Sequence, residues 1–130
     1  MRTHQEIDAR SLAMHQLIAQ KVRQDPALFE HARRTLARWR QTVSVNSQPY
    51  LEQWEHLFNQ GMDASLAVAV EDSERATALR QSSPFVGLLT EVERLNFLIT
   101  WNQDHGYRAD HLQRLLNDEV FRQDIAGRLA

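Results

Sequence analysis

The sequence predicts an all-α fold, a compact single-domain bundle of five to seven helices. Apolar residues recur at steps of three and four along most of the chain. Residues that start or end helices flank these stripes, and no stretch alternates apolar and polar residues as a strand would. The 130 residues suit one core. Within it we expect a helical core domain (residues 1–106) and a helical C-terminal tail (residues 107–130).

Two amphipathic helices are predicted at the start of the chain. Thr3 and Glu6 are spaced as a capping box, and the helix that they open carries apolar residues as far as Val22. Asp25 and Pro26 are typical of the N-cap and first position of a second helix. The inward stripe of this second helix is Phe29, Ala32, Leu36 and Trp39.

The middle of the chain predicts three more helices. Ser47 and Pro49 open one, and Gly61 ends it. Residues 63–70 are apolar on all sides, and their alanines favour a buried helix over a buried strand. A short helix follows over residues 74–81.

A loop is expected next, because Pro84 disfavours helix in the residue before it. Thr90 and Glu93 then form a second capping box, and the helix that it opens ends near Gly106. From residue 109 onward we expect one or two helices, supported by acid-to-arginine pairs with i,i+4 spacing. These pairs are Asp110/Arg114, Asp118/Arg122 and Asp124/Arg128. We also expect all three tryptophans (Trp39, Trp54 and Trp101) to be largely buried.

The composition excludes several classes of function. The absence of cysteine excludes disulfides, thiolate metal sites and a cysteine nucleophile. The glycines form no phosphate-binding loop, and the six histidines lack the spacing of a metal-binding pair. The formal net charge of -2 gives no overall attraction to nucleic acid or to a membrane. Because the N-terminus lacks the apolar region of a signal peptide, we expect a cytoplasmic protein. From the missing motifs we also expect no cofactor and no metal.

A basic stretch on the second helix is the best local indication of a macromolecular contact. Arg33, Arg34, Arg38 and Arg40 lie within eight residues, and no acid follows until Glu52. Arg34 and Arg38 are four residues apart on one helical face, where like charges destabilise a helix without a partner. An acidic protein surface or nucleic-acid phosphates would each satisfy them, and a solvated face is the alternative.

A tryptophan and three loop residues complete this candidate partner-binding surface. Trp39 stands between Arg38 and Arg40, and the loop with Ser82, Ser83 and Phe85 is expected to expose an aromatic ring on a turn. The predicted contact residues are therefore Arg33, Arg34, Arg38, Trp39, Ser82, Ser83 and Phe85.

The sharpest enzymatic pattern is Arg10 followed by His15, which resembles the arginine-to-histidine motif of the HEPN ribonucleases. The resemblance implies that His15 moves the proton of a ribose 2'-hydroxyl while Arg10 holds the phosphate. Random placement of the arginines and histidines in this chain would give about two such pairs. A separation of five residues also puts the two side chains roughly 140° apart on a helix. HEPN proteins pair two chains, so this geometry is a handicap for the site and not an exclusion.

Several longer segments carry a second resemblance, and they are residues 8–15, 25–28, 36–39, 47–51, 71–75 and 80–85. They resemble a family of small all-helical bacterial proteins that look like the accessory or antitoxin partner of a nucleotidyltransferase-like or toxin-like protein. The similarity covers roughly residues 1–101.

The resemblance implies a non-catalytic protein-binding module, the antitoxin-like half of a toxin–antitoxin pair. Its partner would be a toxin or a nucleotidyltransferase-like protein encoded in the same operon. The alternative function is an HEPN-like metal-independent ribonuclease that uses Arg10 and His15. A homodimer and a nucleic-acid contact stay open, and no membrane is expected.

Overall fold

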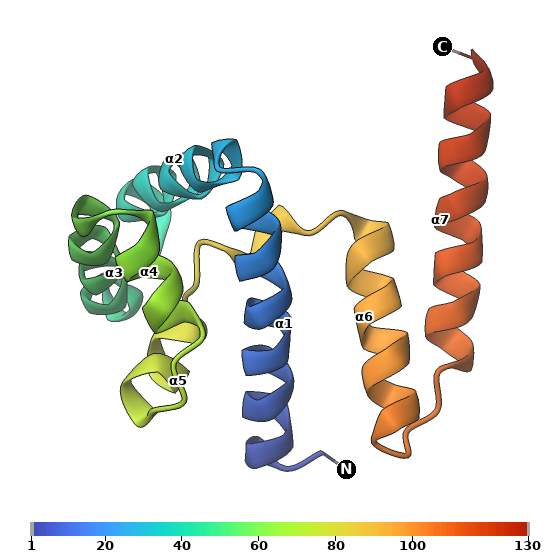
Figure 1. Cartoon of the computed structure of the whole chain (residues 1–130), viewed down its shortest axis with the longest axis horizontal. Coiled ribbons are helices and arrows are strands. Elements are labelled where there is room, and N and C mark those ends of the chain that lie inside the picture. Colours follow the sequence, from blue (N-terminus) through green and yellow to red (C-terminus); the bar gives the residue numbers. More distant parts are fainter. Residues whose placement is uncertain (1, 130) are drawn as a thin grey trace. The chain divides into compact units, whose positions relative to one another are not determined.

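The computed structural model describes residues 2–129, and α-helices make up most of them (Figure 1). Two 3-10 turns, Val45–Ser47 (η1) and Val86–Leu88 (η2), and no strand occur in this described range. The all-α prediction is therefore confirmed. The seven α-helices are α1 (His4–Gln24), α2 (Ala27–Thr42), α3 (Gln48–Gln60), α4 (Met62–Ala69), α5 (Glu74–Arg80), α6 (Glu91–Asp104) and α7 (Asp110–Leu129).

The chain divides into two compact units, residues 1–88 and residues 89–130. The first unit contains α1 to α5, and the second is a hairpin of α6 and α7. We expected the division near residue 106, with α6 in the core. It lies before α6 because α6 packs along α7. Among the described residues, no helix combines the length and the apolarity that a bilayer crossing requires.

Local capping explains where several helices begin and end. Both predicted capping boxes form: the Thr3 hydroxyl accepts from the Glu6 N–H at 3.1 Å, and the Thr90 hydroxyl accepts from the Glu93 N–H at 3.1 Å. Gly61 ends α3 with a φ of 122°, a conformation that favours glycine. The start of α2 differs by one residue from the prediction, because Pro26 is its N-cap and Asp25 lies outside it.

The core of the first unit is an aromatic cluster. Trp54 lies edge-on to Phe58 and Phe85, with ring centroids 6.2 and 5.7 Å away, and Phe58 in turn lies 4.8 Å from Phe29. The indole N–H of Trp54 donates to the carbonyl oxygen of Leu79 at 2.9 Å. This bond satisfies the one polar atom of the ring inside the core.

One aromatic prediction needs correction. Phe85, expected on an exposed turn, is 0% exposed, because its ring fills the space beside Trp54 and Phe58. Of the three tryptophans, Trp54 is wholly buried, and Trp39 and Trp101 are partly exposed. Trp101 stacks on the exposed ring of His105, with ring centroids 3.8 Å apart.

The second unit has a tight connection and a largely exposed outer helix. The Asn102 carbonyl accepts from the Tyr107 N–H at 2.7 Å, and its side-chain amide donates to the Arg108 carbonyl at 3.0 Å. Helix α7 buries none of its described residues. Of the three predicted i,i+4 ion pairs, only Asp124 with Arg128 forms, at 3.1 Å. One member of each of the other two pairs has a different partner: Asp110 pairs with Arg108, and Arg122 pairs with Glu119.

Candidate protein-binding site

A mainly apolar pocket opens beside Trp39, at the corner between α2 and α3. Its volume is about 240 Å³, below the roughly 300–1,000 Å³ of most small-molecule sites and closer to the size of one large side chain. None of its lining residues ionises. They are Trp39, Val43, Ser47, Leu51, Gln81, Ser82, Ser83 and Val86.

Trp39 differs from Trp54 in how its ring is used. The Trp54 indole is wholly buried and its N–H has the Leu79 carbonyl as acceptor. Trp39 is only partly buried, and in the described part of the chain nothing accepts from its indole N–H. A tryptophan with an apolar body in a pocket and a free donor at its rim is typical of contact surfaces.

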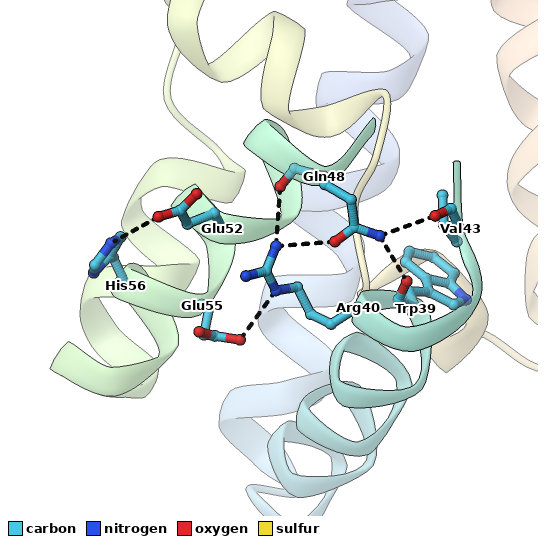
Figure 2. Close-up of polar contacts among 7 residues, drawn as sticks. All are labelled: Trp39, Arg40, Val43, Gln48, Glu52, Glu55 and His56. Carbon is cyan, nitrogen blue, oxygen red and sulfur yellow. Dashed lines mark hydrogen bonds and ion pairs between the residues drawn. The ribbon is translucent and has the colours of Figure 1, made fainter. Parts of the chain in front are cut away.

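A polar cluster fixes the corner that holds this pocket (Figure 2). The Gln48 side-chain amide donates to the carbonyls of Trp39 and Val43, at 3.2 and 3.0 Å, and so satisfies the C-terminal end of α2. Arg40 donates to the Gln48 side chain at 2.9 Å and pairs with Glu55 at 3.4 Å. The C-terminal end of α2, which carries Trp39, is therefore anchored on α3.

The opposite wall of the pocket is held by a buried histidine. His15, 1% exposed, donates from Nδ1 to the Ser11 carbonyl at 2.8 Å. The Nε2 atom of the neutral ring is then an acceptor, so the Ser83 hydroxyl donates to it, at 2.8 Å. The Ser83 oxygen in turn accepts from the Phe85 N–H at 3.2 Å. This chain of hydrogen bonds ties the loop to α1.

The charge state of His15 follows from its surroundings. Burial lowers the pKa of the imidazole below its ordinary value, and the nearby Arg80 cation lowers it further. The hydrogen bond to Ser11 acts in the opposite direction. His15 is therefore a neutral structural group. Its contact with Ser83 resembles a nucleophile–base pair in distance, but Ser83 is only 2% exposed and its oxygen also accepts from the Phe85 N–H.

Of the three predicted contact arginines, one is bonded within the fold and two are exposed. Arg33 donates to the Phe58 carbonyl at 3.2 Å, pairs with Glu30 at 3.5 Å and lies over the Phe29 ring, so it supports the fold. Arg34 and Arg38 are exposed, and within residues 2–129 neither side chain has an ion-pair or hydrogen-bond partner. Of the predicted basic residues on α2, Arg34 and Arg38 are therefore the ones that carry an unpaired positive charge.

The other loop residues also have assigned positions. Ser82 and Ser83 both line the pocket, Ser82 partly exposed and Ser83 buried against His15. Phe85 forms part of the core. Of the seven predicted contact residues, Trp39, Ser82 and Ser83 thus line the pocket, and Arg34 and Arg38 are exposed on the same helix as Trp39.

The ribonuclease pair does not form one site in this structure. His15 faces the core, with both ring nitrogens bonded within the chain. Arg10 is half-exposed, and its pKa is lowered by burial and then by the neighbouring Arg2 cation. A phosphate held by Arg10 would have no accessible imidazole beside it.

A second cleft, of about 510 Å³, lies between α1 and α5 and is acidic. Asp8, Asp72 and Glu74 line it, and the guanidinium of the buried Arg80 lies close enough to interact with Asp72 and Asp8. Arg80 also bonds to the Ala69 and Glu71 carbonyls, so it closes the turn after α4. Within the described residues, no cluster of three or more histidine, aspartate or glutamate side chains could hold a metal ion.

No protein-family model, no curated protein and no solved structure matches this chain. The antitoxin-like function and the ribonuclease alternative therefore stay predictions.

Several residues in and around the pocket were absent from the sequence prediction. Val43 is an apolar residue between polar ones, and that contrast was a usable signal. Val86, beside other apolar loop residues, and Gln48 carried no comparable signal, and the role of Gln48 depends on where the end of α2 lies in space.

Proposed function

We propose that this chain is a non-catalytic protein-binding module that receives one apolar side chain of an acidic partner segment beside Trp39. The observation that carries the proposal is the uncharged pocket at Trp39, next to two unpaired arginines on the same helix. The pocket gives the partner an apolar anchor, and the arginines give it orientation and a faster encounter.

Charge supports an acidic partner over a basic one. Arg38 lies about 100° around α2 from Trp39, and Arg34 lies about 140° from it. A peptide anchored in the pocket would reach Arg38 first and would continue around the helix to reach Arg34. Carboxylates there would form charge-assisted hydrogen bonds, whereas lysines would meet like charge.

The class of the partner comes from the sequence resemblance of residues 1–101. A toxin-like or nucleotidyltransferase-like protein is accordingly the partner that we propose, with this chain in the antitoxin-like role. An acidic segment with an exposed aromatic or aliphatic residue is the feature that such a partner must present.

The test uses two synthetic peptides with one central phenylalanine, flanked by glutamates in one and by lysines in the other. Isothermal titration calorimetry should detect binding of the glutamate peptide only, and higher salt should weaken it. The Arg34→Glu/Arg38→Glu variant should lower its affinity at least about tenfold, since two attractive charges become repulsive. Trp39→Ala should lower it as well, by removing the anchor site.

The matched control is Arg23→Glu/Arg114→Glu, which reverses two exposed arginines elsewhere and changes the net charge equally. Its affinity for the glutamate peptide should stay close to that of the wild type. Equal binding of the lysine peptide, or no binding of either peptide, would contradict the proposal.

A further inference from the structure

The outer face of α7 is apolar and uncovered within its own unit. Phe121 is 63% exposed, Ile125 38% and Leu129 83%, and they follow one another at steps of four. Surface positions on a helix rarely carry three such residues in line unless another surface covers them. The stripe therefore indicates a contact that the second unit does not itself make.

Helix α6 cannot supply this contact. The half-buried residues of α7, Leu112, Leu116 and Glu119, mark the side toward α6. Phe121 and Ile125 lie on the opposite side, since they are about 160° and 120° of rotation away from Glu119. Helix α7 has 20 residues and α6 has 14, so the last turns of α7 also extend beyond the N-terminal end of α6 (Figure 1).

The charges that flank the stripe specify what fits against it. Asp118, Phe121, Ile125 and Arg128 fall within about 80° of one another around the helix. Their order along the chain is acid, apolar, apolar, base. Read in the reverse direction it becomes base, apolar, apolar, acid, so the face is complementary to itself when two copies run antiparallel.

We propose that α7 pairs with α7 of a second copy of this chain, antiparallel and about a two-fold axis. Phe121 of each copy packs on Ile125 of the other, and Asp118 of each meets Arg128 of the other. A parallel pair would instead set Asp118 against Asp118 and Arg128 against Arg128, which like charges oppose.

The side chains at this face are available for the pairing. Asp118 is exposed, and within the described residues it has no ion-pair partner. Among residues 2–129, Arg128 is paired only with Asp124 of its own helix, and its side chain is 77% exposed, so this bond is readily exchanged for one to Asp118 of a second copy. The contact spans only about three helical turns. We therefore expect weak association, with a dissociation constant on the order of 100 μM, since stable interfaces are larger.

Sedimentation velocity of the full chain over a range of concentrations tests the pairing by charge exchange. Asp118→Arg alone and Arg128→Asp alone should each weaken dimerisation by about tenfold, because each places two like-charge pairs in the symmetric contact. The double variant Asp118→Arg/Arg128→Asp should restore wild-type dimerisation. An equimolar mixture of the two single variants should also form dimers.

Two further variants separate this face from the rest of the molecule. Phe121→Ser/Ile125→Ser should abolish the dimer while circular dichroism shows unchanged helix content. Trp39→Ala should leave the dimer intact, which makes this test independent of the peptide-binding site. A protein that stays monomeric at millimolar concentration overturns the proposal. So does a dimer that the single charge exchanges leave unchanged, since a parallel pair or another surface would behave in that way.

Discussion

In residues 1–88 the large aromatic side chains lie inside, whereas in residues 89–130 the large apolar side chains of α7 lie outside. Trp54, Phe58 and Phe85 are at most 1% exposed and contact one another, and Phe121 is 63% exposed on a helix with no buried residue. In the first unit, the large core side chains are covered by other residues of the chain. The second has one inner seam, between α6 and α7, and an outer face that only another molecule or surface can cover.

The same contrast occurs within the first unit at the level of single residues. Trp54 has a buried ring with a satisfied N–H, and Trp39 is only partly buried and has a free N–H. A residue of the first kind stabilises the fold, and a residue of the second kind is available for binding. The predictions below test this separation, from the largest expected effect to the smallest.

The largest effect is expected from Trp54→Ala. It removes a buried ring from the aromatic cluster and one of the two N–H donors to the Leu79 carbonyl, so the free energy of unfolding should fall by about 3–5 kcal/mol. Urea unfolding followed by circular dichroism measures the change. Trp39→Ala is the matched control and should cost clearly less. Equal costs at the two positions would show that Trp39 belongs to the core.

The hydrogen bonds of the loop predict an intermediate effect for Ser83→Ala. Without the hydroxyl, the His15 Nε2 atom and the Phe85 N–H are both left buried without their partner, at a cost of about 1–3 kcal/mol. The neighbouring Ser82→Ala removes a half-exposed hydroxyl and should change stability by less than about 0.5 kcal/mol. A cost at Ser82 as large as that at Ser83 would contradict the hydrogen-bond scheme.

The same histidine predicts a pH dependence. The pKa of His15 is lower in the folded chain than in the unfolded chain, so the unfolded state binds more protons once the pH falls below about 6.5. The stability that His15 contributes is full above this pH and declines as the pH falls toward its folded pKa. His15→Gln removes the titration, so the loss of stability from pH 7 to pH 5 should be smaller in this variant. An unchanged slope would show that the pKa of His15 is not lowered by folding.

The corner below Trp39 predicts a smaller effect. Gln48→Ala removes the side-chain donor to the Trp39 and Val43 carbonyls and one of the hydrogen bonds of Arg40, which keeps its ion pair with Glu55, so we expect a loss of about 1 kcal/mol in unfolding experiments. Gln53→Ala, an exposed glutamine on the same helix, is the control and should be close to neutral. A neutral result at Gln48 as well would mean that the corner is held by packing alone.

The smallest effect is expected on the outer face of α7. At a concentration where the chain is monomeric, Phe121→Ser should change the free energy of unfolding by less than about 0.5 kcal/mol. The reason is that the Phe121 side chain is already largely exposed in the folded chain. Thermal unfolding at low and high protein concentration checks this. A loss as large as that at Trp54 would show that Phe121 is covered within one chain.

The elements were predictable from sequence because their signals are local. The capping boxes at Thr3 and Thr90 and the stop at Gly61 each act within one turn of helix, and all three lie where they were expected. The same local reasoning set the limits of α3 and α4 closely. Local signals do not report which helix packs on which, and so α6 was assigned to the wrong neighbour.

The site was less predictable because its residues depend on distant partners. Phe85 follows a loop proline, yet it is buried because Trp54 and Phe58, about thirty residues earlier, leave a space for its ring. Arg33 and Arg34 are neighbours with the same side chain. Only the position of the Phe58 carbonyl makes Arg33 structural and leaves Arg34 free.

The most direct measurement for the proposed binding site follows the indole N–H signals of the three tryptophans by NMR. The glutamate-flanked peptide is titrated into the ¹⁵N-labelled chain, and Trp→Phe variants assign the three signals. We predict that the Trp39 signal shifts with a saturating dependence on peptide concentration, while those of Trp54 and Trp101 stay in place. A Trp39 signal that does not move, or equal shifts at all three rings, would contradict the assignment of Trp39 as the binding residue.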